Sequence, residues 1–172
     1  MKMGLKSLLF GVHQFIYHPI CVLLAWLDLY KSYPDYKELV CIIVHDWGYY
    51  KCENMDDSLG QQHPIFGANL VYNLFKKQKY KNLCLGHSRH YSKKYNVDIS
   101  KLYYADKLSM KYDLPILYLI RSTLSGEIKE FMYSDNSYGK NISNKYEWCK
   151  SARLNGIKLS KNPNNVEYQK EY

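Results

Sequence analysis

Residues 39–49 read Leu-Val-Cys-Ile-Ile-Val-His-Asp-Trp-Gly-Tyr, an apolar run that ends in a histidine and an aspartate. Apolar residues repeat up to Val44 at the spacing of one helix face, and the pattern stops at Gly48, where a helix can end. A carboxylate such as Asp46 is costly to bury unless something positive pairs with it, and a divalent metal is the strongest such partner. The stretch therefore predicts a buried helix with the metal-capable pair His45-Asp46 at its C-terminal end.

Helical spacing also dominates the rest of the chain, and no alternating run is long enough to indicate a sheet. Pro19 falls near the start of one helical segment, where proline is tolerated, although it could instead kink that helix. We therefore predict an all-α, single-domain helical bundle over residues 1–159, followed by a disordered tail over 160–172. The segments expected to be helical are 15–30, 39–48, 65–75, 80–87, 102–109, 116–124 and 145–154, and the expected loops are 49–64 and 134–145.

Length and composition limit the class of protein. The chain has 172 residues, of which 47% are hydrophobic and 23% charged, as in one ordinary globular domain and unlike a disordered, collagen-like or disulfide-scaffold chain. The five cysteines are odd in number and form no Cys-x-x-Cys pair, which favours a reducing compartment. The apolar run 20–27 is far shorter than the about 20 residues of a membrane span. We expect a cytoplasmic protein that does not enter a membrane.

Positive charge is concentrated in two stretches. The formal net charge is +8; residues 76–111 hold ten Lys and Arg against two acids, and residues 139–172 hold seven against three. Such stretches attract polyanions, which include nucleic acid, nucleotide phosphates and anionic membranes. A merely solvated lysine-rich face is the other interpretation.

Further metal-capable residues lie on both sides of the His45-Asp46 pair. His18 precedes it at the start of an apolar helix, and Asp106 follows it on another expected helix. One histidine, a His-Asp pair and a distant aspartate offer nitrogen and oxygen ligands, which suit Mn, Fe, Co, Ni, Mg or Zn rather than a metal that prefers thiolates. The sequence thus predicts a divalent metal cofactor.

The order of these residues resembles the HD-domain superfamily of metal-dependent phosphohydrolases. The match comprises His18, the segment His45-Asp46-Trp47-Gly48-Tyr49, and Asp106 within Tyr104-Ala105-Asp106-Lys107-Leu108-Ser109, and it is strongest over residues 13–125. The resemblance implies an HD-type helical domain with one or two divalent ions. It assigns His18, His45, Asp46 and Asp106 to one ion, and assigns His63 and His87, with Asp46 as the bridge, to a second.

The same resemblance implies hydrolysis of a phosphoester or phosphoanhydride bond of a nucleotide or related small phosphorylated metabolite, by a metal-activated water. Many HD nucleotidases place a glutamate a few residues after the His-Asp pair, where this chain has Tyr49, Tyr50 and Lys51. The group that transfers a proton therefore stays open, and His13 is interpreted as structural. The candidate catalytic residues are Asp46, Lys51, His90 and Lys107, and the candidate phosphate-binding residues are Arg89, Lys93, Lys94 and Lys107.

Two other functions remain as alternatives. A nucleic-acid-binding protein could use the lysine-rich surface together with interleaved tyrosines on which bases stack. An HD fold that has lost its activity could bind a nucleotide without cleaving it. The tyrosines expected to serve the first alternative are Tyr91, Tyr95, Tyr103 and Tyr104.

Overall fold

The computed structural model describes residues 1–133, 142 and 144–160, and this part of the chain is helical without a strand. The all-α prediction is therefore confirmed. The α-helices are α1 (Met3–Phe10), α2 (Tyr17–Tyr30), α3 (Tyr36–Val44), α4 (Pro64–Phe75), α5 (Gln78–Leu85), α6 (Arg89–Tyr95), α7 (Lys101–Ser109), α8 (Pro115–Ser125), α9 (Glu127–Tyr133) and α10 (Lys145–Ser160); the 3-10 helices are η1 (Trp47–Lys51) and η2 (Gly60–Gln62).

Local sequence explains where several helices begin. The Asp35 carboxylate accepts the backbone N–H groups of the first turn of α3, and the Glu38 side chain accepts the N–H of Asp35, which completes a capping box. Proline opens α4 and α8 at Pro64 and Pro115, positions at which a helix has no N–H bond to lose. Pro19 lies in the first turn of α2 for the same reason.

The structure differs from the sequence prediction mainly in short elements. The expected loop 49–64 contains η2 and most of η1, and α1, α6 and α9 lie where no helix was predicted. These helices have seven or eight residues each, so none is long enough to display a full apolar stripe. Helix α10 continues past the predicted end at 154 to Ser160. Most of the expected loop 134–145 and the rest of the expected tail lie outside the described residues.

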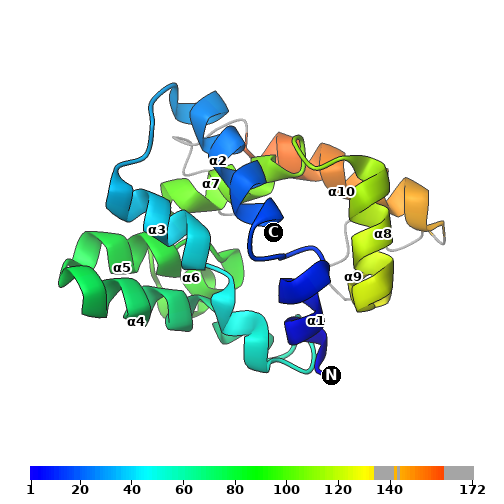
Figure 1. The fold of residues 1–172 in the computed structure, drawn as a ribbon, viewed down its shortest axis with the longest axis horizontal. Helices are drawn as coiled ribbons and strands as arrows, with labels where there is room; N and C mark the ends of the chain where they lie inside the picture. Colours follow the sequence, from blue (N-terminus) through cyan, green and yellow to red (C-terminus); the bar gives the residue numbers. More distant parts are fainter. Residues whose placement is uncertain (134–141, 143, 161–172) are drawn as a thin grey trace.

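Two hydrophobic clusters organise the helices. The larger cluster joins α2, α3, α4, α5 and α7 around Trp26, Ile42 and Leu102. The smaller one joins α8, α9 and α10 around Ile128 and Trp148. In Figure 1, α4 and α5 lie side by side at the left, and α8 and α9 lie at the right. A cavity of about 250 Å³ is lined by residues of the smaller cluster, among them Tyr118 and Trp148, and by polar side chains of α2, α6 and α7 and of the segments around them.

Close backbone approach joins the end of α3 to the start of α4. A Cβ on Gly67 of α4 would lie 2.6 Å from the carbonyl oxygen of Val44, closer than real Cβ atoms come to such an atom. A Cβ on Gly48 would overlap the backbone of His63. Glycine at these positions therefore lets the His45-Asp46 pair lie directly beside His63.

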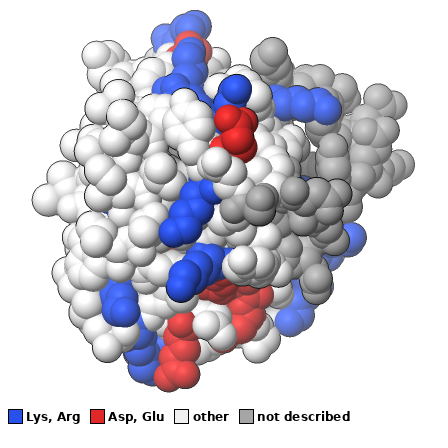
Figure 2. All heavy atoms as spheres, turned by 90° about the vertical axis from the view of Figure 1, so that its right-hand side faces the viewer, with Lys and Arg blue, Asp and Glu red and all other residues white. Residues whose placement is uncertain are grey.

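The surface is mixed in character. Figure 2 looks onto the right-hand side of Figure 1, and on this face the described Lys and Arg side chains stand apart among uncharged residues, with Asp and Glu near some of them.

All five cysteines are buried and none forms a disulfide. Within the described ranges, every helix is too short or too polar to cross a bilayer.

Replacing Gly67 with alanine has two opposing effects on stability, one from helix propensity and one from the contact of the new Cβ with α3. Alanine in a helix is intrinsically favoured over glycine by about 1 kcal/mol. Because the new Cβ would press on the Val44 carbonyl, we expect Gly67→Ala nevertheless to lower the free energy of unfolding by about 1–3 kcal/mol. Urea denaturation measures this change.

The matched control is Asn69→Ala, which changes an exposed residue of the same helix. We expect its stability to equal or exceed that of the original protein. A Gly67→Ala protein that is more stable than the original would show that α3 and α4 do not approach as described.

Candidate metal centre

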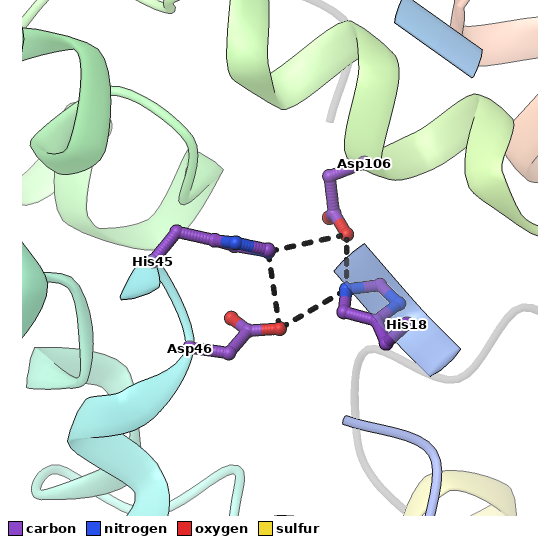
Figure 3. Close-up of side chains that lie close together, drawn as sticks. All are labelled: His18, His45, Asp46 and Asp106. Carbon is purple, nitrogen blue, oxygen red and sulfur yellow. Dashed lines mark ion pairs between the residues drawn. The ribbon is translucent and has the colours of Figure 1, made fainter. Parts of the chain in front are cut away.

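Four side chains from three helical elements face a common point, as Figure 3 shows. His18 lies in the first turn of α2, His45 and Asp46 follow the last turn of α3, and Asp106 lies in α7. His18 Nε2 is 3.1 Å from Asp46 Oδ2 and 3.2 Å from Asp106 Oδ1. His45 Nε2 is 3.1 Å from the same Asp46 oxygen. We call these four residues the first group.

The contacts within the first group are close but do not have the geometry of hydrogen bonds. His18 Nε2, His45 Nε2 and Asp46 Oδ2 are all buried without a hydrogen-bond partner. Two atoms each about 2.1 Å from one ion are about 3.0 to 3.4 Å apart in octahedral or tetrahedral geometry. The 3.1 and 3.2 Å separations match that range. The first group could therefore hold a divalent ion.

Asp46, His63 and His87 form a second group, on the other side of the Asp46 carboxylate. The Oδ1 atom of Asp46 is 3.6 Å from His63 Nε2 and 3.3 Å from His87 Nε2. His63 immediately precedes α4, and His87 lies two residues past the end of α5. The three side chains are buried and close enough to hold an ion. The two Asp46 oxygens thus face different groups, which is the arrangement of a bridging carboxylate.

Backbone carbonyls fix the ring orientation of three of these histidines. Nδ1 of His45 donates to the carbonyl of Ile42 at 2.8 Å, and Nδ1 of His63 donates to that of Gly60 at 2.7 Å. Nδ1 of His87 donates in the same way to Cys84. Each bond reaches three residues back along the chain and leaves Nε2 for the interior, as outer hydrogen bonds do for histidines that bind metals.

This orientation creates a conflict between His63 and His87. Their Nε2 atoms are 2.9 Å apart, and with both Nδ1 atoms protonated the two lone pairs face each other. Turning either ring into its Nε2–H form would deprive a buried carbonyl, that of Gly60 or Cys84, of its donor. A cation placed between the rings and Asp46 removes the conflict without breaking either bond.

The charges of the two groups differ. Burial lowers the pKa of His45, but the Asp46 and Asp106 carboxylates outweigh burial and raise it to about 10. In the second group, burial and then the neighbouring His87 hold the pKa of His63 well below its usual value. Burial likewise lowers the pKa of His87. Near neutral pH His45 of the first group is therefore protonated, whereas the histidines of the second group offer free lone pairs.

The cavity brings some of the other predicted residues to the candidate metal centre. Arg89, His90 and Lys107 line it beside both groups, and the Lys107 ammonium lies 2.9 Å from Asp106 Oδ2. Lys51, Lys93 and Lys94 are exposed and are not part of the cavity lining. Arg89, His90 and Lys107 thus lie where a molecule bound to the two metal groups would be.

Sequence reasoning did not place His13 in the cavity wall. His13, interpreted above as structural, lines the cavity, and its Nδ1 lies 3.0 Å from Oε1 of the fully buried Glu127. Burial raises the pKa of Glu127, but hydrogen bonds from His13 and two serine hydroxyls outweigh it and lower the pKa. Glu127 is 114 residues away along the chain, and no local pattern connects the two. The sequence offered one signal for Glu127, namely the position of this acidic residue directly after Gly126, where a helix can begin.

Comparisons of this chain with protein-family models, curated proteins and solved structures found no match. The interpretation of the site therefore depends on the side chains and their geometry.

The pH dependence of metal affinity should differ between the two groups. An ion entering the first group must displace a proton from His45, because the carboxylates raise the pKa of His45 to about 10 against the effect of burial. The same carboxylates raise the pKa of His18. We therefore expect its affinity to increase as the pH rises from about 6 to about 8, with proton release on binding. An ion entering the second group meets neutral histidines, so its affinity should change less.

Calorimetric titration in buffers of different ionisation enthalpy counts the released protons. His87→Ala, which removes a ligand of the second group only, serves as the control that isolates the first. Equal proton release from both groups would contradict the charges described above.

Proposed function

We propose that the protein is a metal-dependent phosphohydrolase that binds two divalent ions and cleaves a phosphoester or phosphoanhydride bond of a nucleotide or small phosphorylated metabolite. The observation that carries this proposal is the division of Asp46 between two groups, with the unrelieved 2.9 Å approach of His63 Nε2 to His87 Nε2 in one of them. The resemblance of His18, His45-Asp46 and Asp106 to the HD-domain superfamily supports the same reaction class.

Paired divalent ions lower the pKa of a bound water and neutralise charge on phosphate oxygens. The chain's own residues would hold and orient the substrate. Arg89 on α6 and Lys107 on α7 line the cavity beside the ligand groups and are suited to phosphate oxygens. His18, His45 and Asp46 are buried, so their positions are set by the packing of α2, α3 and α7 before any substrate enters.

The shape of the cavity favours a small substrate. Beyond the polar groups it is lined by Tyr118, Phe131 and Trp148, which offer an apolar wall to the remainder of a phosphorylated molecule. A nucleic-acid interface is less favoured, because Tyr103 and Tyr104 are only 5% and 9% exposed and cannot stack on successive bases. Of the four tyrosines considered, only Tyr95 is exposed, while Tyr91 is half-buried.

Hydrolysis should require both a metal ion and Asp46. Chelated protein is supplied in turn with Mn, Fe, Co, Ni, Mg or Zn and assayed for phosphate or nucleoside release on a panel of nucleotides and sugar phosphates. We expect turnover only with added metal, and we expect Asp46→Ala and His45→Ala to abolish it while circular dichroism shows little loss of helix. Asn69→Ala, an exposed change on α4, is the control that retains activity. Full activity of Asp46→Ala protein would refute the mechanism.

The number of bound ions should follow the same geometry. Elemental analysis after metal loading and desalting is expected to give about two ions per chain in the original protein and about one in His87→Ala. Asp46→Asn should retain less metal than both the original protein and His87→Ala, because it weakens both groups at once. A single ion per chain that His87→Ala leaves unchanged would remove His63 and His87 from the ligand set.

A further inference from the structure

The apolar face of α8 is turned away from the protein interior. Regular apolar spacing predicts this helix from the sequence, and an apolar face of that kind normally packs against the core. Four of its aliphatic side chains are instead between 40% and 69% exposed, namely Ile116, Leu117, Ile120 and Leu124. The outward side of α8 is therefore strongly apolar.

The inward side of the same helix is more polar. Its buried residues are Tyr118, Ser122 and Ser125. The Ser122 hydroxyl donates to the carbonyl of Leu119 at 3.2 Å, and the Ser125 hydroxyl donates to a carboxylate oxygen of Glu127. Because serine buries little apolar surface, packing of this side removes little aliphatic area from water. The described part of the chain thus leaves most of the aliphatic surface of α8 uncovered.

The exposed face of α8 also carries no charge. Arg121 is the one charged residue between Leu114 and Gly126, and it is turned inward, where it pairs with Asp113 and donates to the carbonyl of Gly11 at 3.3 Å. Helix α8 lies at the right of Figure 1, so Figure 2 looks onto its side of the molecule, where much of the described surface is uncharged. Two copies of a chain with a formal net charge of +8 repel each other. A face without Lys or Arg is where that repulsion is least.

The exposed apolar area matches what a dimer needs. Together with Leu114, which is 59% exposed, the four residues expose on the order of 500 Å² of apolar surface. A standard interface buries about 800 Å² on each partner, and roughly 60% of that area is apolar. The face of α8 therefore offers about the apolar area that one copy contributes to a standard interface.

The spacing of the exposed residues suits a twofold axis. Leu117 lies one turn before Ile120, and Leu124 lies one turn after it, which is the spacing of a seam between two packed helices. If two α8 helices pack antiparallel, the two Ile120 side chains meet at the axis, and Leu117 of each copy lies opposite Leu124 of the other. One patch then serves both copies, and the assembly closes as a dimer.

We propose that the protein forms a twofold symmetric homodimer through the outward face of α8, defined by Ile116, Leu117, Ile120 and Leu124. This inference goes beyond the proposed phosphohydrolase function and does not depend on it. Tyr118, on the inward side of the same helix, lines the cavity. Pairing of two α8 helices therefore also fixes one wall of the cavity in each copy.

A charge placed in the apolar face tests the interface. Analytical ultracentrifugation over a series of protein concentrations gives the dissociation constant of the dimer. We expect the original protein to be dimeric at about 10 µM. Leu124→Glu should raise the dissociation constant by about 100-fold or more, because an unpaired charge is costly to bury.

The matched control is Leu74→Glu, which makes the same change on α4, a helix at the opposite side of Figure 1. Leu74 is 62% exposed and Leu124 is 64% exposed, so the two variants differ mainly in location. We expect Leu74→Glu to leave the dissociation constant unchanged. Circular dichroism of both variants should match that of the original protein. Ile116→Glu, at the most exposed position of the face, is a second disruptive variant.

A compensating charge tests the antiparallel arrangement. Leu117→Lys combined with Leu124→Glu places opposite charges across the proposed axis, whereas within one chain the two positions are two turns apart. We expect this double variant to bind itself at least about tenfold more tightly than Leu124→Glu does. The melting temperature should rise with protein concentration in the original protein and should not do so in Leu124→Glu at the same concentrations.

Three outcomes would overturn the inference. An original protein that stays monomeric up to about 100 µM would leave the face of α8 to a different partner. Dimers that persist in both Leu124→Glu and Ile116→Glu would place the interface elsewhere, and a double variant no tighter than Leu124→Glu would reject the antiparallel pairing. None of these measurements uses metal or substrate, so each outcome is distinct from failure of the proposed function.

Discussion

The constraint on which the site depends is the burial of Asp46. Its side chain is 8% exposed, and each of its oxygens faces imidazole nitrogens from two different parts of the chain. Burial alone would raise its pKa, but the facing histidines hold the pKa well below the usual value, so a negative charge persists in the interior. An interior charge of this kind is tolerated only while its partners stay in place. The helices that supply His18, His45, His63 and His87 are therefore bound to one another through this carboxylate as well as through apolar packing.

The division of the core into two clusters gives the site its shape. The larger cluster fixes α2, α3, α4, α5 and α7, which carry or flank the candidate ligands. The smaller cluster, in α8, α9 and α10, contributes no ligand but supplies an apolar wall and, at its edge, Glu127. A rigid set of ligands and a separately packed wall meet at the cavity. Changes in Tyr118 or Trp148 can therefore alter what fits in the cavity without moving the ligands.

The sequence predicts most of the long helices and the ligand set, because both are encoded by residues close together or by an ordered pattern. The apolar spacing of 39–44 and the His45-Asp46 pair that follows it are local signals of this kind. The short helices α1, α6 and α9 lack such a stripe, and their positions are set by tertiary contacts. The partnership of His13 with Glu127 depends on how α9 docks beside α1, which no periodicity encodes. Exposure is equally hidden from the sequence, so Lys93 and Lys94 could not be separated from Arg89 and Lys107 in advance.

The wide separation of Ser7 and Glu127 along the chain also affects how the protein would be made on a ribosome. Every candidate metal ligand lies between residues 18 and 106, so that part of the chain emerges before α9 does. The hydroxyl of Ser7 and the ring of His13 cannot form their hydrogen bonds with Glu127 until Glu127 is synthesised, 120 residues after Ser7. Because folding during synthesis proceeds from the N-terminus, a nascent chain would hold the residues of both metal groups while the cavity still lacks its second wall. The order of translation thus separates in time the synthesis of the two candidate metal groups from that of the second wall of the cavity.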